Sequence, residues 1–242
     1  MAANGTTPKI TLYTNHRCPW AHRAHITLKE IGLPYEEVII DLDRPRDPWY
    51  LEVNPRGLVP SIKYSNGAIK DEIITESGIV SQFLADAHPS HLLPTSNTPE
   101  GALKRARINF FVDTWFSKIG SFQFKILLEQ DEAKQEEIVK EFLALVEKEI
   151  EPLLKDAAPF FGGSEKLTLA EALTAPFALR NSSLSKHGAL PASLGKGLDA
   201  LPNYSKWAKA VIAQESVTYI YDEEAVVKGT VARVAKLKAT GK

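Results

Sequence analysis

Residues 15–21 read NHRCPWA and mark the point where a predicted strand gives way to a predicted helix. The residues before them, Lys9–Tyr13, alternate in polarity and are rich in β formers, which is typical of a strand. From Pro19 to Ile31 apolar residues recur at helical spacing, and Gly32 follows as a helix-ending residue. Proline is tolerated in the first helical turn because an N–H there would lack a partner. We therefore expect Cys18 at a helix N-terminus.

This position bears on the chemistry of the thiol. A helix N-terminus offers unpaired N–H groups and the positive end of the helix dipole, and Arg17 and Arg23 add positive charge nearby. Such surroundings favour the thiolate, which is the nucleophilic form of cysteine. The alternative is that Cys18 is a small buried hydrophobic residue. Because it is the only cysteine in 242 residues, an intrachain disulfide, a Cys-rich zinc site and a Cys-x-x-Cys pair are all excluded.

Outward from this turn, the first 88 residues predict a small mixed α/β domain. The polar, proline-broken stretch 41–54 is too irregular for a long element, and Asn66-Gly67 is a strong hairpin signal. The helix at the end is expected to direct Ile79, Val80, Phe83 and Leu84 inward. The elements expected after the first strand and helix are a strand at Pro34–Ile40, strands at Leu58–Tyr64 and Ala68–Asp71, and a helix at Ser77–Ala87.

The remainder of the chain predicts helices only. Residues 89–99 have the composition of a linker, and helical periodicity dominates from residue 100. One apolar stripe runs from Ile138 to Leu154, and Thr168–Glu171 has the pattern of a capping box. We therefore expect an α/β domain at 1–88, a linker at 89–99 and an all-helical domain at 100–242.

Composition narrows the class of protein. The formal net charge is −1 with both signs mixed, so there is no basic surface to follow nucleic-acid phosphates. No stretch reads as a secretory leader or reaches the roughly 20 apolar residues that span a bilayer. The expectation is a cytoplasmic protein with neither a nucleic-acid nor a membrane partner, whose thiol stays reduced.

Two further motifs carry candidate binding residues. In NPRGLVP, residues 54–60, a proline opens a strand, which is unusual unless its peptide bond is cis or the strand is at an edge. A cis bond would turn the Val59 backbone toward an extended, peptide-like ligand. In Glu76-Ser77, Ser77 is a plausible helix N-cap. Alternatively, the helix N-terminus and the Ser77 hydroxyl receive a carboxylate while Glu76 holds an ammonium group.

Together these motifs resemble the glutathione transferase family, in its cysteine-type omega or omega-like class. The resemblance spans nearly the whole chain: it covers CPWA at 18–21, NPRGLVP at 54–60, Glu76-Ser77, TLAE at 168–171 and Ala175-Pro176. It implies a thioredoxin-like N-terminal domain that binds glutathione and an all-helical C-terminal domain. It also implies a second substrate in a cleft between the domains, and a homodimer.

The resemblance assigns glutathione-binding roles by position. Cys18 matches the nucleophile that forms a mixed disulfide with glutathione. Val59, before the cis-Pro60 that the family shows, would pair with the cysteinyl backbone of the tripeptide. Glu76 and Ser77 would hold its γ-glutamyl end.

Other positions depart from the family pattern or concern the second substrate. Arg46 matches a lysine near the glycyl carboxylate, and its planar fork changes the contact geometry. Trp20 replaces a Phe or Tyr and reshapes the pocket rim. Arg180 matches an arginine of the second-substrate cleft, with a surface salt bridge as the alternative, and Phe111 and Trp115 are assigned to the same cleft.

The implied activity is that of a glutathione-dependent thioltransferase, which reduces disulfides or dehydroascorbate and removes glutathionyl groups. Because the chain has no second cysteine, a second glutathione must resolve the Cys18 mixed disulfide. The alternatives are conjugation or glutathionyl removal in a specialised or detoxification pathway, and a non-catalytic binding protein. Tyr13 could replace Cys18 as activator but is expected to pack as a strand residue. His16, His22 and His25 lie near Cys18 in sequence, with a general base as the less favoured interpretation, and no metal is expected.

Overall fold

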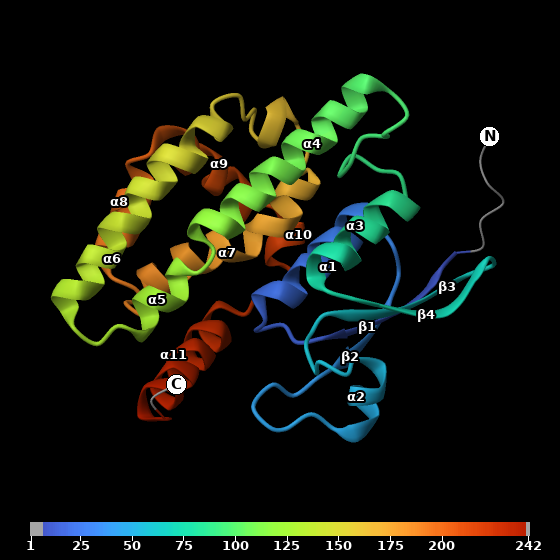
Figure 1. Cartoon of the computed structure of the whole chain (residues 1–242), viewed down its shortest axis with the longest axis horizontal. Coiled ribbons are helices and arrows are strands. Elements are labelled where there is room, and N and C mark those ends of the chain that lie inside the picture. The colour runs from blue at the N-terminus through green and yellow to red at the C-terminus, as the bar shows by residue number, and fades with distance from the viewer. Residues whose placement is uncertain (1–6, 241–242) are drawn as a thin grey trace.

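The computed structural model describes residues 7–240, and its first part is a four-stranded sheet with three helices (Figure 1). The strand order is β2-β1-β3-β4, with β1 parallel to β2 and the other pairs antiparallel. Figure 1 shows α1 and α3 on the sheet face that meets the helical domain, with α2 on the other side. The elements are β1 (Lys9–Thr14), α1 (Pro19–Ile31), β2 (Glu36–Ile39), α2 (Pro48–Val53), β3 (Ser61–Asn66), β4 (Ile69–Thr75) and α3 (Ser77–Ala87).

This domain confirms the predicted element order and corrects it at two points. Helix α1 has the predicted bounds, and Gly32 ends it in a left-handed conformation with φ 74°. The stretch 41–54, expected to be irregular, contains the short helix α2, which begins at Pro48 and buries Tyr50. On α3, Val80 and Leu84 are fully buried as expected, but Ile79 is 59% exposed, so its predicted inward direction is wrong.

The second part of the chain is all helical, as predicted. Its long central helix α7 packs against α1, α3 and α4, so it joins the two domains. The elements are α4 (Pro99–Thr114), the π-helical turn η1 (Trp115–Ile119), α5 (Phe122–Leu128), α6 (Glu132–Leu145), the π-helical turn η2 (Val146–Ile150), the 3-10 turns η3 (Glu151–Leu154) and η4 (Phe161–Gly163), α7 (Leu169–Lys186), α8 (Ala192–Asp199), α9 (Pro202–Ile212), α10 (Glu215–Thr218) and α11 (Glu223–Thr240).

The predicted capping box at the start of α7 is present and does more than cap the helix. Glu171 is fully buried, and its Oε2 accepts hydrogen bonds from the backbone N–H and the hydroxyl of Thr168, at 2.8 and 2.7 Å. Its Oε1 accepts from the Phe161 backbone and from the Trp207 indole, each at 2.8 Å. One carboxylate therefore ties the start of α7 to η4 and α9.

The C-terminal helix reaches the sheet domain. Figure 1 shows α11 beside α5 and close to the start of α1. At Gly229 a Cβ atom would lie 3.1 Å from the Arg17 guanidinium, so glycine allows this close approach. No helix within residues 7–240 is long and apolar enough to cross a membrane.

Candidate active site

Cys18 is the N-cap residue of α1, as the sequence predicts. Its backbone N–H donates to the Asn15 carbonyl at 3.0 Å, and its own carbonyl accepts from His22 at 3.1 Å as the helix begins. The Asn15 side chain fixes the turn, because it accepts from the Arg17 N–H and donates to the Ile40 carbonyl. The thiol is half-buried, and its Sγ lies 3.9 Å from the Val59 carbonyl oxygen.

The peptide bond between Val59 and Pro60 is cis, which confirms that expectation. Buried polar groups beneath the loop hold it in place. Asn54 donates to the Leu58 carbonyl at 2.9 Å, and the Tyr50 hydroxyl donates to the same oxygen at 2.5 Å. The NPRGLVP motif therefore builds a rigid loop that presents the Val59 backbone beside Cys18.

The Glu76-Ser77 pair sits at the start of α3, but the capping roles differ from the prediction. Glu76 is the N-cap residue, with φ 70°, and Ser77 is the first residue of the helix, so the predicted Ser77 cap is wrong. The Glu76 carboxylate forms an ion pair with Arg56. Ser77 is buried, and its hydroxyl oxygen accepts a hydrogen bond from Nη1 of Arg23 at 2.9 Å.

Arg46 binds backbone carbonyls of two separate segments. Its Nε donates to Gly57 at 2.9 Å, and its Nη1 donates to Asp41 and Arg44 at 2.7 and 2.8 Å. The side chain thereby joins the segment 41–46 to the loop that carries the cis proline.

Three aromatic rings meet next to the Cys18 turn: Trp20, Phe116 and Phe177, here called the aromatic cluster. The Trp20 ring centroid lies 5.4 Å from that of Phe116 and 4.9 Å from that of Phe177. Trp20 is 42% exposed, so the cluster reaches the surface.

The structure does not bring Phe111 and Trp115 to this cluster. They are 0% and 2% exposed, and both pack against Trp207 inside the helical domain. Their buried positions therefore do not support their assignment to a cleft. Phe116 and Phe177, which the sequence analysis did not assign, lie beside Trp20 instead.

Arg23 is a functional candidate that the sequence indicated only as a nearby charge. It is 5% exposed, and its Nε donates to the Leu173 carbonyl of α7 at 2.8 Å. Its guanidinium carbon lies 4.5, 4.2 and 5.3 Å from the centres of the Trp20, Phe116 and Phe177 rings. Burial lowers the pKa of Arg23 to about 9, and the charge of the Cys18 thiolate partly offsets that effect.

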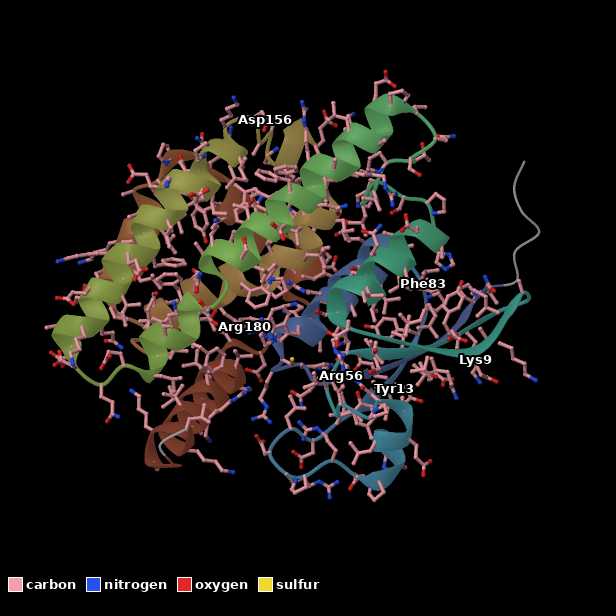
Figure 2. All side chains as sticks on the ribbon, in the orientation of Figure 1. Lys9, Tyr13, Arg56, Phe83, Asp156 and Arg180 are labelled. Carbon is pink, nitrogen blue, oxygen red and sulfur yellow. The ribbon has the colours of Figure 1, made fainter. Side chains whose placement is uncertain are left out.

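Arg180 lies buried where the domains meet, which excludes the surface salt bridge considered from sequence (Figure 2). Its Nη1 donates to the Pro176 carbonyl at 2.9 Å, and its Nη2 donates to the Arg17 carbonyl at 3.2 Å. Burial lowers the pKa of Arg180 to about 10, and the Tyr221 hydroxyl and the Cys18 thiolate act in the opposite direction. Arg180 therefore supports the Cys18 turn from the side of α7.

Similarity to known proteins identifies the family of this chain. A family model described as glutathione S-transferase, N-terminal domain, matches residues 17–87. Glutathione S-transferase omega-1 of Mus musculus is 30% identical over 180 residues, which cover 73% of this chain and 68% of that protein. The chain belongs to the glutathione transferase family. Its relatives make it an enzyme of the omega-like class.

Solved structures support the same class. Glutathione transferase Omega 1C from Trametes versicolor is 28% identical with a TM-score of 0.79, over 95% of this chain and 98% of that one. Glutathione transferase Omega 2S from the same organism, solved in complex with 2,4-dihydroxybenzophenone, is 27% identical with a TM-score of 0.76, over 94% and 100%.

His22 and His25, two of the three histidines near Cys18 in the sequence of this transferase, are buried and contact other groups. His22 lies under Tyr221 with its Nδ1 3.3 Å from Arg180, and burial lowers its pKa well below the usual value. His25 is buried, with Nε2 2.8 Å from the Thr14 hydroxyl and Nδ1 3.0 Å from the Tyr35 hydroxyl. Burial lowers the pKa of His25 to about 4. None of these contacts supports a general base for Cys18.

One group within residues 7–240 has the residue types of a metal site: His16, His25 and Glu37, whose ligand atoms lie within 4.8 Å of one another. His16 Nε2 is 2.8 Å from a Glu37 oxygen, and both nitrogens of His25 also have hydrogen-bond partners. His16 therefore pairs with Glu37, whereas the ring nitrogens of His25 pair with the hydroxyls of Thr14 and Tyr35.

Tyr13 packs against Trp49 and Tyr50, which confirms its expected packing as a strand residue.

Proposed function

We propose that this transferase catalyses glutathione-dependent thiol transfer and reduction through a mixed disulfide between Cys18 and glutathione. The observation that carries the proposal is the position of the thiol. Cys18 caps the N-terminus of α1, and its Sγ lies 3.9 Å from the backbone of the residue before a cis proline. A nucleophilic sulfur and a backbone that can pair with an extended thiol peptide are thus side by side.

Glutathione would lie along the loop from Cys18 to the start of α3. Its cysteinyl backbone would pair with Val59, with Pro60 holding that residue in position. Its γ-glutamyl end would meet the N-terminus of α3, where Ser77 offers a hydroxyl and Glu76 a carboxylate for the ammonium group. Trp20 and the Arg46 loop would flank the tripeptide, with Arg46 acting through the loop that it fixes.

The reaction needs two thiol–disulfide exchanges. The Cys18 thiolate attacks the glutathione sulfur of a disulfide RS–SG, forms Cys18–S–SG and releases RS⁻, which takes up a proton. A second glutathione thiolate then attacks the glutathionyl sulfur, releases the Cys18 thiolate and forms oxidised glutathione. The sum is RS–SG plus one glutathione giving RSH plus oxidised glutathione. With dehydroascorbate as oxidant, two glutathiones are oxidised instead.

The second substrate would contact the aromatic cluster. Trp20, Phe116 and Phe177 offer apolar ring surface next to Cys18, which suits an aromatic or other apolar group on sulfur. The relative solved with 2,4-dihydroxybenzophenone supports this choice of ligand. Arg180 would support the Cys18 turn through its hydrogen bond to the Arg17 carbonyl.

Whole-protein mass spectrometry tests the nucleophile. After incubation with oxidised glutathione, the protein should gain the mass of one glutathionyl group, and Cys18→Ser should gain none. Turnover of a small glutathionyl disulfide should fall to background in Cys18→Ser, while Tyr13→Phe keeps its activity. An adduct on Cys18→Ser, or unchanged turnover, would show that another residue reacts.

We also propose that the protein is a homodimer that works in a reducing, cytoplasmic compartment. Leu103 and Phe110 are 52% and 60% exposed, and their spacing of seven residues places them on one face of α4. A partner subunit would cover such apolar surface. Light scattering after size exclusion should give twice the chain mass, and Phe110→Glu should shift the protein toward monomer.

A further inference from the structure

Arg23 is a buried arginine that contacts both Ser77 and the aromatic cluster. Its side chain is buried, its Nη2 has no hydrogen-bond partner, and no carboxylate within residues 7–240 forms an ion pair with it. A buried guanidinium normally requires a paired anion, because the cost of removing its charge from water is large. Here three aromatic ring faces supply part of that compensation.

The contact with Ser77 shows where the charge acts. Nη1 of Arg23 donates to the Ser77 hydroxyl oxygen at 2.9 Å, so the hydroxyl proton is free to be donated to another group. Ser77 is the first residue of α3, where the backbone N–H groups and the helix dipole also favour an anion. A donor polarised by a cation binds a carboxylate more strongly than an isolated serine does.

The remaining contacts hold this arrangement still. Nε of Arg23 is fixed by the Leu173 carbonyl at 2.8 Å, so the guanidinium plane is tied to α7 of the helical domain. The aromatic cluster surrounds the same guanidinium, with ring centres 4.2 to 5.3 Å from its central carbon. One side chain thus touches the expected γ-glutamyl site and the expected second-substrate side.

We propose that Arg23 is a positioning residue for glutathione: through Ser77 it selects disulfides that carry the γ-glutamyl carboxylate, and through the aromatic cluster it connects that site to the second substrate. The proposal rests on the proposed function. It predicts that the protein discriminates by the carboxylate of the substrate and not by the reactivity of the disulfide bond alone.

The test compares two disulfides in the first half-reaction, the formation of the Cys18 adduct. Oxidised glutathione carries the γ-glutamyl carboxylate, and 2-hydroxyethyl disulfide carries no charge. The second-order rate constant for each disulfide is measured by whole-protein mass spectrometry. The readout is the ratio of the rate constant with oxidised glutathione to that with 2-hydroxyethyl disulfide. Because the intrinsic reactivity of Cys18 affects both rate constants, a change in thiolate character alone leaves the ratio nearly unchanged.

Arg23→Met should lower this ratio by about 10- to 100-fold, the usual worth of a hydrogen bond to a charged group. Ser77→Ala should lower it similarly, and the double variant should go no lower than Arg23→Met, because both side chains act on one carboxylate. Arg23→Lys keeps the charge and should recover part of the ratio. Arg105→Met is the matched control, because Arg105 also joins the domains, through Asp86 on α3 and the Pro94 carbonyl, but lies away from Ser77.

The outcomes separate the two proposals. If the wild-type protein forms no Cys18 adduct with oxidised glutathione, the proposed function fails. If the adduct forms, but Arg23→Met lowers the rate constants with both disulfides equally, Arg23 only connects the domains and this inference is wrong. Should Arg23→Met fail to fold, Arg23→Lys decides: a ratio equal to that of the wild-type protein overturns the proposal, and a lower ratio supports it.

Discussion

Glu171 and Arg23 are both charged and buried, and their surroundings differ completely. Glu171 lies inside the helical domain, and each of its oxygens accepts two hydrogen bonds from protein groups. Arg23 lies between the domains with two hydrogen bonds, three ring faces and an unpartnered Nη2. All the hydrogen bonds of the Glu171 carboxylate join segments of the helical domain, whereas Nη2 of Arg23 has no protein partner.

The largest effect on stability is expected from breaking the hydrogen bonds of Glu171. Glu171→Ala leaves donors from Thr168, Phe161 and Trp207 without an acceptor, which should cost at least about 3 kcal/mol of unfolding free energy. Urea denaturation measures the loss. Glu171→Gln retains one acceptor oxygen and should lose less, and equal losses in both would show that the negative charge itself is what matters.

Acid should produce the next largest effect, through the buried His25. The unfolded chain binds a proton there near pH 6.5, whereas burial holds the folded pKa at about 4. The unfolded state therefore binds more protons between these values, and stability falls as the pH drops from about 6.5 to 4, by up to about 3 kcal/mol.

Thermal unfolding across this pH range measures the slope, with His25→Gln as the comparison. The variant should be less stable at neutral pH, because the contacts to Thr14 and Tyr35 change, but should lose less stability on acidification. An identical slope in both proteins would assign the acid sensitivity to other groups, with buried His22 the first to examine.

The smallest effects should come from the two arginines that cross the domain boundary. Arg23→Met removes two hydrogen bonds but also a poorly compensated buried charge, so its net change should stay within about 1.5 kcal/mol. Arg105→Met breaks a partly exposed ion pair with Asp86, which is worth less than about 1 kcal/mol. Equilibrium unfolding of both proteins, beside the disulfide ratio, separates stability from selection. A loss at Arg23 as large as that of Glu171→Ala would remove the distinction between the two sites.

Local signals in the sequence predicted much of the secondary structure around the site. The bounds of α1, its Gly32 cap and the Thr168–Glu171 box depend on residue types at fixed short spacings, and the structure contains all of them. The order of strands and helices in the first domain follows equally from local periodicity. The cis bond before Pro60 followed from the family resemblance, with a proline at a strand start as weaker support.

The features that local signals missed depend on contacts between distant segments. Arg23 and Ser77 are 54 residues apart, and Arg23 and Leu173 are 150 apart, so no spacing rule connects them. The Ser77 cap was wrong because Glu76 adopts a positive φ, a conformation that its residue type does not suggest. Phe111 and Trp115 were chosen over Phe116 because an aromatic-rich segment does not reveal which face is buried.

The π-helical turn η1 contains both Trp115 and Phe116. A π turn closes its hydrogen bonds one residue later than an α turn, as if one residue had been inserted into the helix. Trp115 and Phe116 are the first two residues of this turn; Trp115 packs in the buried core, and Phe116 packs against Trp20 in the aromatic cluster. Insertions and deletions of one residue here would rotate a different ring toward Cys18 while α7 and its capping network stay in place. We therefore expect a one-residue change in the length of this helix to alter the ring surface beside Cys18 without any substitution in the segments that carry Cys18, Val59 and Ser77.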